Sequence, residues 1–278
     1  MKNAGFDISF SFLGNLEEVQ KSLDAAQKAG MKIVIGCPEL KTETEKTVKR
    51  FMTHPALAGY FLRDEPAVDA FTELGNWAKR VNAVDSKNFC YVNLFPNYAT
   101  ATQLGTSDYR EYVNKFAQEV PLHFLSYDSY PLTTAEGVYS KWHQNLEIFT
   151  DEAKKAGKPF WGFAQSVLFD DFHEVPTLAT MRLQMYTNLA YGAQGLQYFT
   201  YWTPVSLTED FRGAPISLTG KRSAVYDDIK LLNQEIKNLA GVFYGSKLIS
   251  IKYAGKETPI GTNRLSTLPA SLKVLETI

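Results

Sequence analysis

Short apolar segments alternate with amphipathic segments of helical periodicity along most of this chain. The apolar segments start roughly 25 to 37 residues apart, which is about the length of one strand–helix unit. Strict alternation of strand and helix predicts a parallel sheet with helices outside it. The predicted strands are Phe6–Phe12, Lys32–Cys37, Ala58–Leu62, Phe89–Leu94, Phe124–Tyr127, Phe160–Ala164 and Leu196–Tyr201.

The segments between the strands carry helix signals. Leu16–Ala29 follows Asn15, a favoured N-cap residue, and ends at Gly30. Val68–Ala83 has apolar residues at helical spacing. Further helices are predicted over Thr42–Thr53, Tyr109–Gln118, Gly137–Ala156, Thr177–Tyr191 and Arg222–Ala240.

Seven such units are one fewer than a (β/α)8 barrel contains. Met1–Gly5 resembles the last turn of a helix, so we expect the chain to be part of a longer protein whose first barrel strand lies upstream. An open, doubly wound sheet would need a Gly-rich phosphate loop after its first strand, and the residues that follow Phe12 are not one. We therefore predict an α/β fold, a TIM-type barrel without its first strand, with an open seam between Phe6–Phe12 and Leu196–Tyr201.

The pattern changes near residue 240. Residues 1–240 are predicted to form the incomplete barrel. Ser246–Tyr253 alternates as a strand would, and the residues after it are rich in Thr, Pro, Gly and Ser. Residues 241–278 are therefore predicted to be the start of a C-terminal β domain or a tail.

Composition narrows the choice of partners. The net charge of −1 does not suggest a nucleic-acid partner, and no apolar run approaches the roughly 20 residues of a membrane span. Cys37 and Cys90 fall in predicted strands and are expected to be free thiols. The oligomeric state stays open. A secreted or periplasmic location would require a signal peptide upstream.

Carboxylates, amides and aromatic rings follow the predicted strands, where the active sites of parallel barrels lie. No His or Lys ends a strand, and the four His residues lack ligand spacing. We therefore expect no metal site, no Schiff-base chemistry and no cofactor. Such a rim suits proton transfer on hydroxyl-rich ligands, which means carbohydrates. The strand-end groups are Pro38-Glu39, Asp64-Glu65, Asn93, Tyr127 to Tyr130, Gln165-Ser166 and Tyr201-Trp202.

The strand that ends in Asp64-Glu65-Pro66 is the strongest single signal. Carboxylates are rarely buried at a strand end for packing reasons, so Glu65 is the first candidate for chemistry. Its pKa should then be raised, because a general acid must stay protonated near the working pH. The alternative is an ordinary carboxylate at a helix start. Asp64 would bind ligand, orient Glu65 or pair with Arg63.

Four segments together carry a family likeness. They are the strand end at Asp64-Glu65-Pro66, the stretches 124–131 and 188–199, and Trp202. Over about residues 1–240 the chain resembles the catalytic barrel of the β-galactosidase-like glycoside hydrolases, whose two carboxylates sit on barrel strands 4 and 7. The resemblance implies that Glu65, on the fourth strand if one is missing, is the general acid/base. It also implies that Trp202 is a platform for a sugar ring.

One departure from the family pattern concerns the nucleophile. Gln165 stands where the resemblance implies a nucleophilic Glu, and a neutral amide cannot form a glycosyl ester. Asp128 is therefore the second catalytic candidate, with a turn before Pro131 as its alternative role, and Asp170-Asp171 is a weaker source of the carboxylate. Carboxyl groups about 6.5–9.5 Å apart would indicate inversion and about 5–5.5 Å retention. The expected substrate-binding residues are Asp64, Asn93, Tyr127, Tyr130, Gln165, Tyr201 and Trp202.

These observations predict a glycoside hydrolase that acts on O-glycosidic bonds of an oligosaccharide or polysaccharide, with Glu65 as the general acid. A non-catalytic carbohydrate-binding barrel that derives from a glycosidase is the alternative, and a purely structural barrel is a third possibility. The sequence does not identify the sugar or the linkage.

Overall fold

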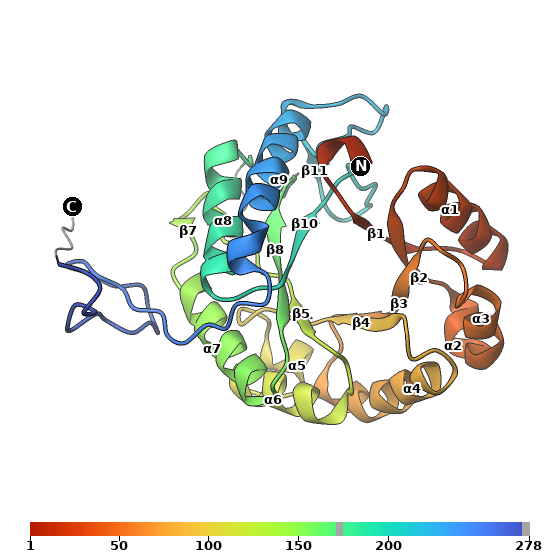
Figure 1. Cartoon of the computed structure of the whole chain (residues 1–278), viewed down its shortest axis with the longest axis horizontal. Helices are drawn as coiled ribbons and strands as arrows, with labels where there is room; N and C mark the ends of the chain where they lie inside the picture. Colours follow the sequence, from red (N-terminus) through yellow and green to blue (C-terminus); the bar gives the residue numbers. More distant parts are fainter. Residues whose placement is uncertain (171–174, 274–278) are drawn as a thin grey trace.

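The main strands form a partial parallel barrel that is surrounded by helices (Figure 1). The computed structural model describes residues 1–170 and 175–273. All seven predicted strands are present, with ends that differ by at most a few residues. They are β1 (Ile8–Phe12), β2 (Lys32–Gly36), β3 (Leu57–Asp64), β4 (Phe89–Asn93), β5 (Leu125–Tyr127), β8 (Phe160–Gln165) and β10 (Gly195–Phe199).

These strands lie side by side in chain order, as in a (β/α)8 barrel. Parallel ladders join β1 to β2, β2 to β3 and β3 to β4, and likewise β5 to β8 and β8 to β10. A bridge between Leu94 and Tyr127 connects the two groups of strands. Within residues 1–170 and 175–273, no ladder joins β1 to β10. The barrel is therefore open at the predicted seam, while the strand that would fill it stays a prediction.

Helices pack around the outside of the strands (Figure 1). Asn15 caps the first of them as predicted, since its side chain accepts hydrogen bonds from the backbone N–H groups of Glu17 and Glu18, both at 3.0 Å. The helices are α1 (Leu16–Lys28), α2 (Pro38–Thr42), α3 (Thr44–Phe51), α4 (Phe71–Val84), α5 (Ala101–Leu104), α6 (Tyr109–Glu119), α7 (Trp142–Lys155), α8 (Leu178–Ala190) and α9 (Ala224–Phe243), with short 3-10 turns η1 (Lys2–Ala4) and η2 (Val68–Ala70).

Two pairs of short strands lie in the loops beyond the main strands. The first, β6 (Leu132–Thr133) with β7 (Gly137–Val138), explains why the helix predicted from Gly137 begins at Trp142 instead. The second pairs β9 (Leu168–Phe169) with β11 (Phe211–Arg212). Pairings of two residues leave no periodicity in the sequence, so the pattern of residues did not predict them.

The hydrophobic core has an outer and an inner part. The outer part, between strands and helices, contains Tyr60, Phe116 and Trp142, all fully buried or nearly so. The inner part lies inside the barrel around Tyr91 and Phe124. The ring of Phe124 stacks on that of Trp161 with 4.1 Å between centroids. Burying each of these rings contributes about 1.5–3 kcal/mol, so the inner rings give the barrel a packed aromatic floor.

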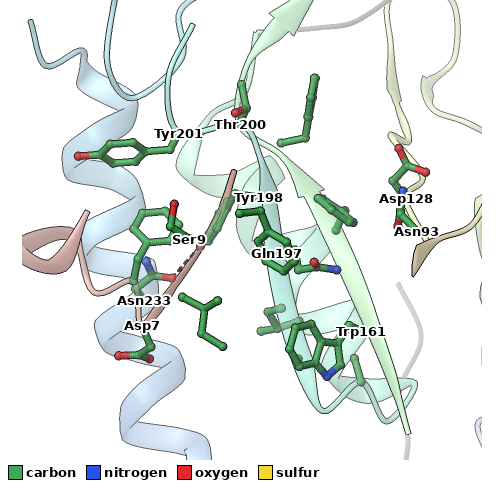
Figure 2. A pocket seen from close by; sticks show the side chains of 18 of the residues that line it. Asp7, Ser9, Asn93, Asp128, Trp161, Gln197, Tyr198, Thr200, Tyr201 and Asn233 are labelled. Carbon is green, nitrogen blue, oxygen red and sulfur yellow. Dashed lines mark hydrogen bonds between the residues drawn. The ribbon is translucent and has the colours of Figure 1, made fainter. Parts of the chain in front are cut away.

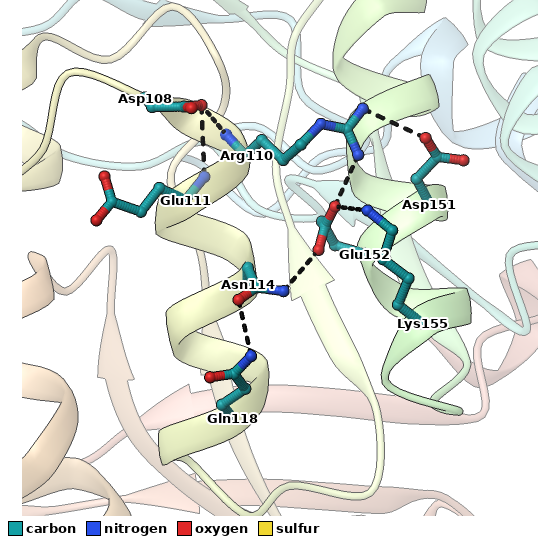
Figure 3. A network of polar contacts seen from close by, with 8 residues as sticks. All are labelled: Asp108, Arg110, Glu111, Asn114, Gln118, Asp151, Glu152 and Lys155. Atoms are coloured by element: carbon teal, nitrogen blue, oxygen red, sulfur yellow. Dashed lines mark hydrogen bonds and ion pairs between the residues drawn. The ribbon is translucent and has the colours of Figure 1, made fainter.

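A buried carboxylate ties α6 to α7 (Figure 3). The Glu152 side chain is 1% exposed and accepts hydrogen bonds from Arg110 at 2.7 Å, Asn114 at 2.8 Å and Lys155 at 2.6 Å. Burial opposes ionisation, but these three donors hold the pKa of Glu152 below its usual value. The charge is thus retained and links the two helices.

The C-terminal segment does not form the strand predicted over Ser246–Tyr253. Among its described residues only an isolated bridge, from Tyr253 to Arg264, has strand character. The segment instead contacts the barrel where the Tyr253 hydroxyl meets that of Tyr191 at 2.8 Å. The alternation of apolar residues did not by itself predict a strand correctly, because the backbone N–H and C=O groups of a strand also need hydrogen-bond partners on a neighbouring strand. That residues 241–278 begin a β domain stays a prediction.

Cys37 and Cys90 are buried free thiols, as predicted. None of the helices in the described part of the chain is both long enough and apolar enough to span a membrane.

Candidate active site

The backbone turns sharply at Glu65, immediately after β3. The Glu65 N–H donates to the carbonyl of Asn93 at 2.9 Å, which extends the pairing with β4 by one residue. At the same residue φ is +42°, in the left-handed region that non-glycine residues rarely adopt. Such strained residues concentrate at functional sites. No ion pair of Arg63 with Asp64 or Glu65 is present in the described structure, so that alternative is not supported.

A cavity of about 1290 Å³ opens beside Glu65. Carboxylates from two strand ends line it, namely Asp64 and Glu65 at the end of β3 and Asp128 after β5, and Asn93 at the end of β4 lines it too. Figure 2 shows Asn93 and Asp128 on one side of this cavity. The cavity continues through the open seam as far as α9, so only part of its volume lies at the strand ends.

The three carboxylates are all shifted toward their protonated forms. Burial raises the pKa of Glu65 most, and the charges of Asp128 and Asp64 raise it further. Burial and the charge of Asp64 likewise raise the pKa of Asp128. Desolvation raises the pKa of Asp64, against the effect of the Asn93 amide. A cluster of this kind retains protons near neutral pH, which is what a general acid requires.

Aromatic rings surround the mouth of the cavity. Trp202 is 50% exposed and Tyr98 is 44% exposed, although both are large aromatic residues. The ring of Tyr130 also lines the cavity and contacts Phe169 and Phe199, each with centroids 5.4 Å apart. Exposed aromatic rings beside carboxylates can stack against the apolar face of a sugar ring.

Tyr201 lies at the seam end of the cavity (Figure 2). Its hydroxyl accepts a hydrogen bond from the Met1 amino group at 2.8 Å, and its ring packs edge-on against Phe6 at 5.4 Å. Among the expected substrate-binding residues, the cavity therefore brings together Asp64, Asn93, Tyr130, Tyr201 and Trp202.

Tyr127 and Gln165, by contrast, do not line the cavity. Tyr127 packs against Phe149 of α7, with ring centroids 4.2 Å apart, because alternate strand residues face opposite sides of the sheet. Gln165 is fully buried, and its side-chain amide donates to the Val167 carbonyl at 3.1 Å. Gln165, expected both at the nucleophile position and among the substrate-binding residues, therefore lies outside the lining of the cavity that Glu65 borders.

The remaining acid candidates are outside the cavity lining. Asp170 links two loops, since its carboxylate accepts a hydrogen bond from the Asp210 N–H at 3.1 Å. Asp171 falls outside the described residues. Glu39 follows β2 and has one carboxylate oxygen that is buried without a hydrogen-bond partner.

Sequence reasoning missed Tyr98 and Gln197, which both line the cavity. Tyr98 lies in a loop and left no signal in the sequence. Gln197 is a polar residue between two largely apolar neighbours within β10, and that interruption was a usable signal. Among residues 1–170 and 175–273, no group of three or more His, Cys, Asp or Glu side chains could hold a metal ion.

Comparison with solved structures finds the same fold in β-galactosidases. The chain is 14% identical to the β-galactosidase of the psychrophilic Marinomonas ef1, with a TM-score of 0.64 over 87% of this chain and 57% of that one. The chain is 12% identical to the β-galactosidase from Bacillus circulans sp. alkalophilus, with a TM-score of 0.66 over 90% of this chain and 54% of that one. It is 13% identical to the β-galactosidase from the Antarctic haloarchaeon Halorubrum lacusprofundi, with a TM-score of 0.62 over 86% of this chain and 52% of that one. The chain thus spans just over half the length of these proteins.

No curated protein sequence matches the chain significantly. The model of glycoside hydrolase family 42, described as Beta-galactosidase, matches residues 92–239. This match begins within β4 and ends within α9, so it includes Asn93, Asp128, Tyr130 and Trp202. Since it covers more than half of the sequence, the chain belongs to glycoside hydrolase family 42.

Proposed function

We propose that this chain hydrolyses O-glycosidic bonds of an oligosaccharide or polysaccharide, with Glu65 as the general acid. The observation that carries the proposal is the meeting of Glu65 with Asp128 and Asp64 in one cavity at the carboxyl ends of parallel strands. The raised pKa of Glu65 supports the role, because the group stays protonated near neutral pH.

In the proposed reaction Glu65 gives its proton to the glycosidic oxygen as the bond to the anomeric carbon breaks. An ionised carboxylate of the same cluster takes a proton from the water that attacks this carbon. One of the two carboxyl groups must therefore be protonated and the other ionised when the substrate binds. Closely interacting acids share protons as a pair, and the charge of Asp128 raises the pKa of Glu65, which favours Glu65 as the protonated member.

Galactosides are the substrates to test first, because the family and the similar structures are described as β-galactosidases. We propose that the exposed ring of Trp202 receives one face of the sugar and that Tyr98 and Tyr130 border the site. Stacking of a sugar on exposed rings buries their apolar surface, which contributes about 25 cal/mol per Å².

The second candidate function is a carbohydrate-binding barrel without catalysis. It is favoured by Gln165, the neutral residue at the position where the family resemblance implies a nucleophile. This candidate retains the cavity and the aromatic rings but loses the chemistry.

The assay measures hydrolysis of aryl β-galactosides by the wild type and by Glu65→Gln, Asp128→Asn and Glu39→Gln. Glu39 is the matched control, a strand-end acid outside the cavity. We expect activity in the wild type and in Glu39→Gln, with large losses in the other two. Galactose binding without turnover in the wild type would favour the binding barrel, and neither binding nor turnover would contradict both functions.

We also propose that an eighth parallel strand completes the barrel between β1 and β10. The open seam and the continuation of the cavity into it support this proposal. The test is a crystal structure of a version extended by the residues encoded upstream. We expect a strand between Ile8–Phe12 and Gly195–Phe199, and an extension that folds elsewhere would contradict the proposal.

A further inference from the structure

Five aromatic side chains that line the cavity contact one another. Their contacting rings have centroids between 5.4 and 6.4 Å apart, and these contacts join all five into one cluster. The members come from β8, from β10 and from the loops that follow β5, β8 and β10. We call this cluster the aromatic wall, and it consists of Tyr130, Phe163, Phe169, Phe199 and Phe211.

The aromatic wall is not part of the hydrophobic core. All five side chains are only partly buried, and none of them belongs to the core clusters found in residues 1–170 and 175–273. Elsewhere in the barrel, rings of the same size such as Phe116 and Phe149 are fully buried. Apolar surface that stays in contact with water is unfavourable, and where it lines a cavity it typically marks the binding site of an apolar ligand.

The backbones of two loops hold part of the wall in place. In the antiparallel pair of β9 and β11, Phe169 lies directly opposite Phe211. Next to this pair, the Asp170 N–H donates to the Asp210 carbonyl and the Asp210 N–H donates to the Asp170 carboxylate, both at 3.1 Å. Figure 1 shows β11 near the end of β10. Because main-chain groups join the two loops, a change of the Phe211 ring alone should leave their pairing intact.

The polar groups of the cavity lie beside the aromatic wall and not within it. Tyr130 follows Asp128 by two residues, and both line the cavity together with Glu65. Among the side chains of the wall, only that of Tyr130 carries a polar group. The hydroxyls of a sugar need hydrogen-bond partners, which the carboxylates and Asn93 can provide. The wall offers almost entirely apolar surface.

We propose that the aromatic wall receives the group on the far side of the cleaved bond, the aglycone, and that it prefers an aromatic aglycone to a second sugar. The inference rests on the proposed function, because it assigns the sugar to the carboxylate side of the cavity. Aromatic rings pack favourably against one another, beyond the gain from burying apolar surface. A second sugar would instead leave hydroxyls without partners along the wall.

The charges at the cavity further restrict the aglycone. Glu209, in the loop that carries Phe211, lines the cavity as well. Together with the carboxylates at the ends of β3 and β5, it would repel an anionic group. The preferred substrate is therefore a glycoside of an uncharged aromatic alcohol.

The test measures binding of three β-thiogalactosides, which carry a methyl, a galactosyl or a naphthyl group on the sulfur. The sulfur link resists hydrolysis, so calorimetry reports affinity without turnover. The three compounds share the galactose, so differences in their affinity report on the aglycone alone. We expect the wild type to bind the naphthyl compound at least about tenfold more tightly than the other two, since naphthyl buries the most apolar surface.

The variants Phe211→Ser and Phe169→Ser should lose most of this preference while binding the methyl compound with nearly unchanged affinity. Phe211→Leu keeps apolar surface at the wall and should retain most of it. The matched control is Phe12→Ser, because Phe12 is a 67% exposed phenylalanine outside the cavity lining. Its preference should equal that of the wild type. Circular dichroism and urea unfolding identify the variants that fold.

Equal affinities of the wild type for the naphthyl and galactosyl compounds would overturn the inference, and this comparison does not depend on the folding of any variant. A preference that persists in folded Phe211→Ser and Phe169→Ser would also overturn it, since the rings would then serve only to pack the loops. Hydrolysis of galactosides without any such preference would leave the proposed function intact. Tight naphthyl binding in a protein that hydrolyses no glycoside would instead contradict the proposed function and support the aromatic site.

Discussion

At the residue scale, the cluster of carboxylates at the cavity reduces the stability of the fold. Glu65, Asp64 and Asp128 all have pKa values raised above those of the unfolded chain, with burial as the main cause. Between the unfolded and the folded pKa values, the native state therefore binds more protons than the unfolded state, and the stability of the fold falls as the pH rises through this range. Active sites commonly reduce stability in this way.

Asp128→Asn should therefore stabilise the protein at pH 8 by about 1–3 kcal/mol, because a pKa raised by one pH unit corresponds to about 1.4 kcal/mol. The amide has no charge to bury, so the gain should disappear near pH 3, where Asp128 is mostly protonated in both states. Urea unfolding at the two pH values measures the difference. A gain of equal size at both would show that charge is not its cause.

Glu65→Gln should reduce the hydrolysis of galactosides with poor leaving groups by about a hundred- to ten-thousand-fold, the usual contribution of a general acid. Nitrophenyl galactosides need less protonation of the leaving oxygen and should lose less. The ratio of kcat/KM for the two substrate types tests this. A uniform loss across leaving groups would contradict the general-acid role.

Gln165→Glu should not create a retaining glycosidase but should lower both stability and activity. Gln165 is fully buried and donates to the Val167 carbonyl, and an ionised Glu has no hydrogen to donate there. We expect a loss of about 2 kcal/mol in the free energy of unfolding, measured by urea denaturation. Higher hydrolytic activity in this variant would place residue 165 at the reaction centre and contradict the geometry described above.

At the scale of elements, the contact between α6 and α7 depends on one buried charge (Figure 3). Glu152→Gln should lower the free energy of unfolding by about 2 kcal/mol, because Arg110 and Lys155 lose their common partner. The matched control is Asp151→Asn on the same helix, whose side chain is 53% exposed and 3.3 Å from Arg110. An exposed ion pair contributes little to stability, so the free energy of unfolding of the control variant should change by less than about 0.5 kcal/mol. Equal effects of the two changes would show that burial of Glu152 is unimportant.

At the scale of the whole molecule, the open seam leaves β1 and β10 as edge strands. Unpaired edges invite association between molecules, and the Phe12 side chain on β1 is 67% exposed. We expect the chain to be poorly soluble, and Phe12→Lys to reduce its aggregation through charge repulsion. Light scattering over a concentration series measures this, and Leu207→Lys, an exposed change away from the strands, is the control. Equal improvement from both would indicate a general charge effect.

The sequence by itself determined the seven main strands, most of the helices and the carboxylates at the end of β3. These features depend on local periodicity, capping residues such as Asn15 and the end of a strand, all of which are encoded within a few residues. The likeness of residues 124–131 and 188–199 to a glycosidase family was also available from sequence, and the family match confirms it.

Only the tertiary structure decided which strand-end side chains meet. Glu65 and Asp128 are distant in sequence and share a cavity because β3 and β5 end at one edge of the barrel. Tyr127 and Gln165 looked equivalent to their neighbours, yet side-chain alternation and local hydrogen bonds keep them out of the cavity lining. The strand expected over Ser246–Tyr253 is reduced to an isolated bridge from Tyr253 to Arg264 in the described part of the chain. These outcomes depend on contacts between segments far apart in the chain, and no local pattern of residues encodes such contacts.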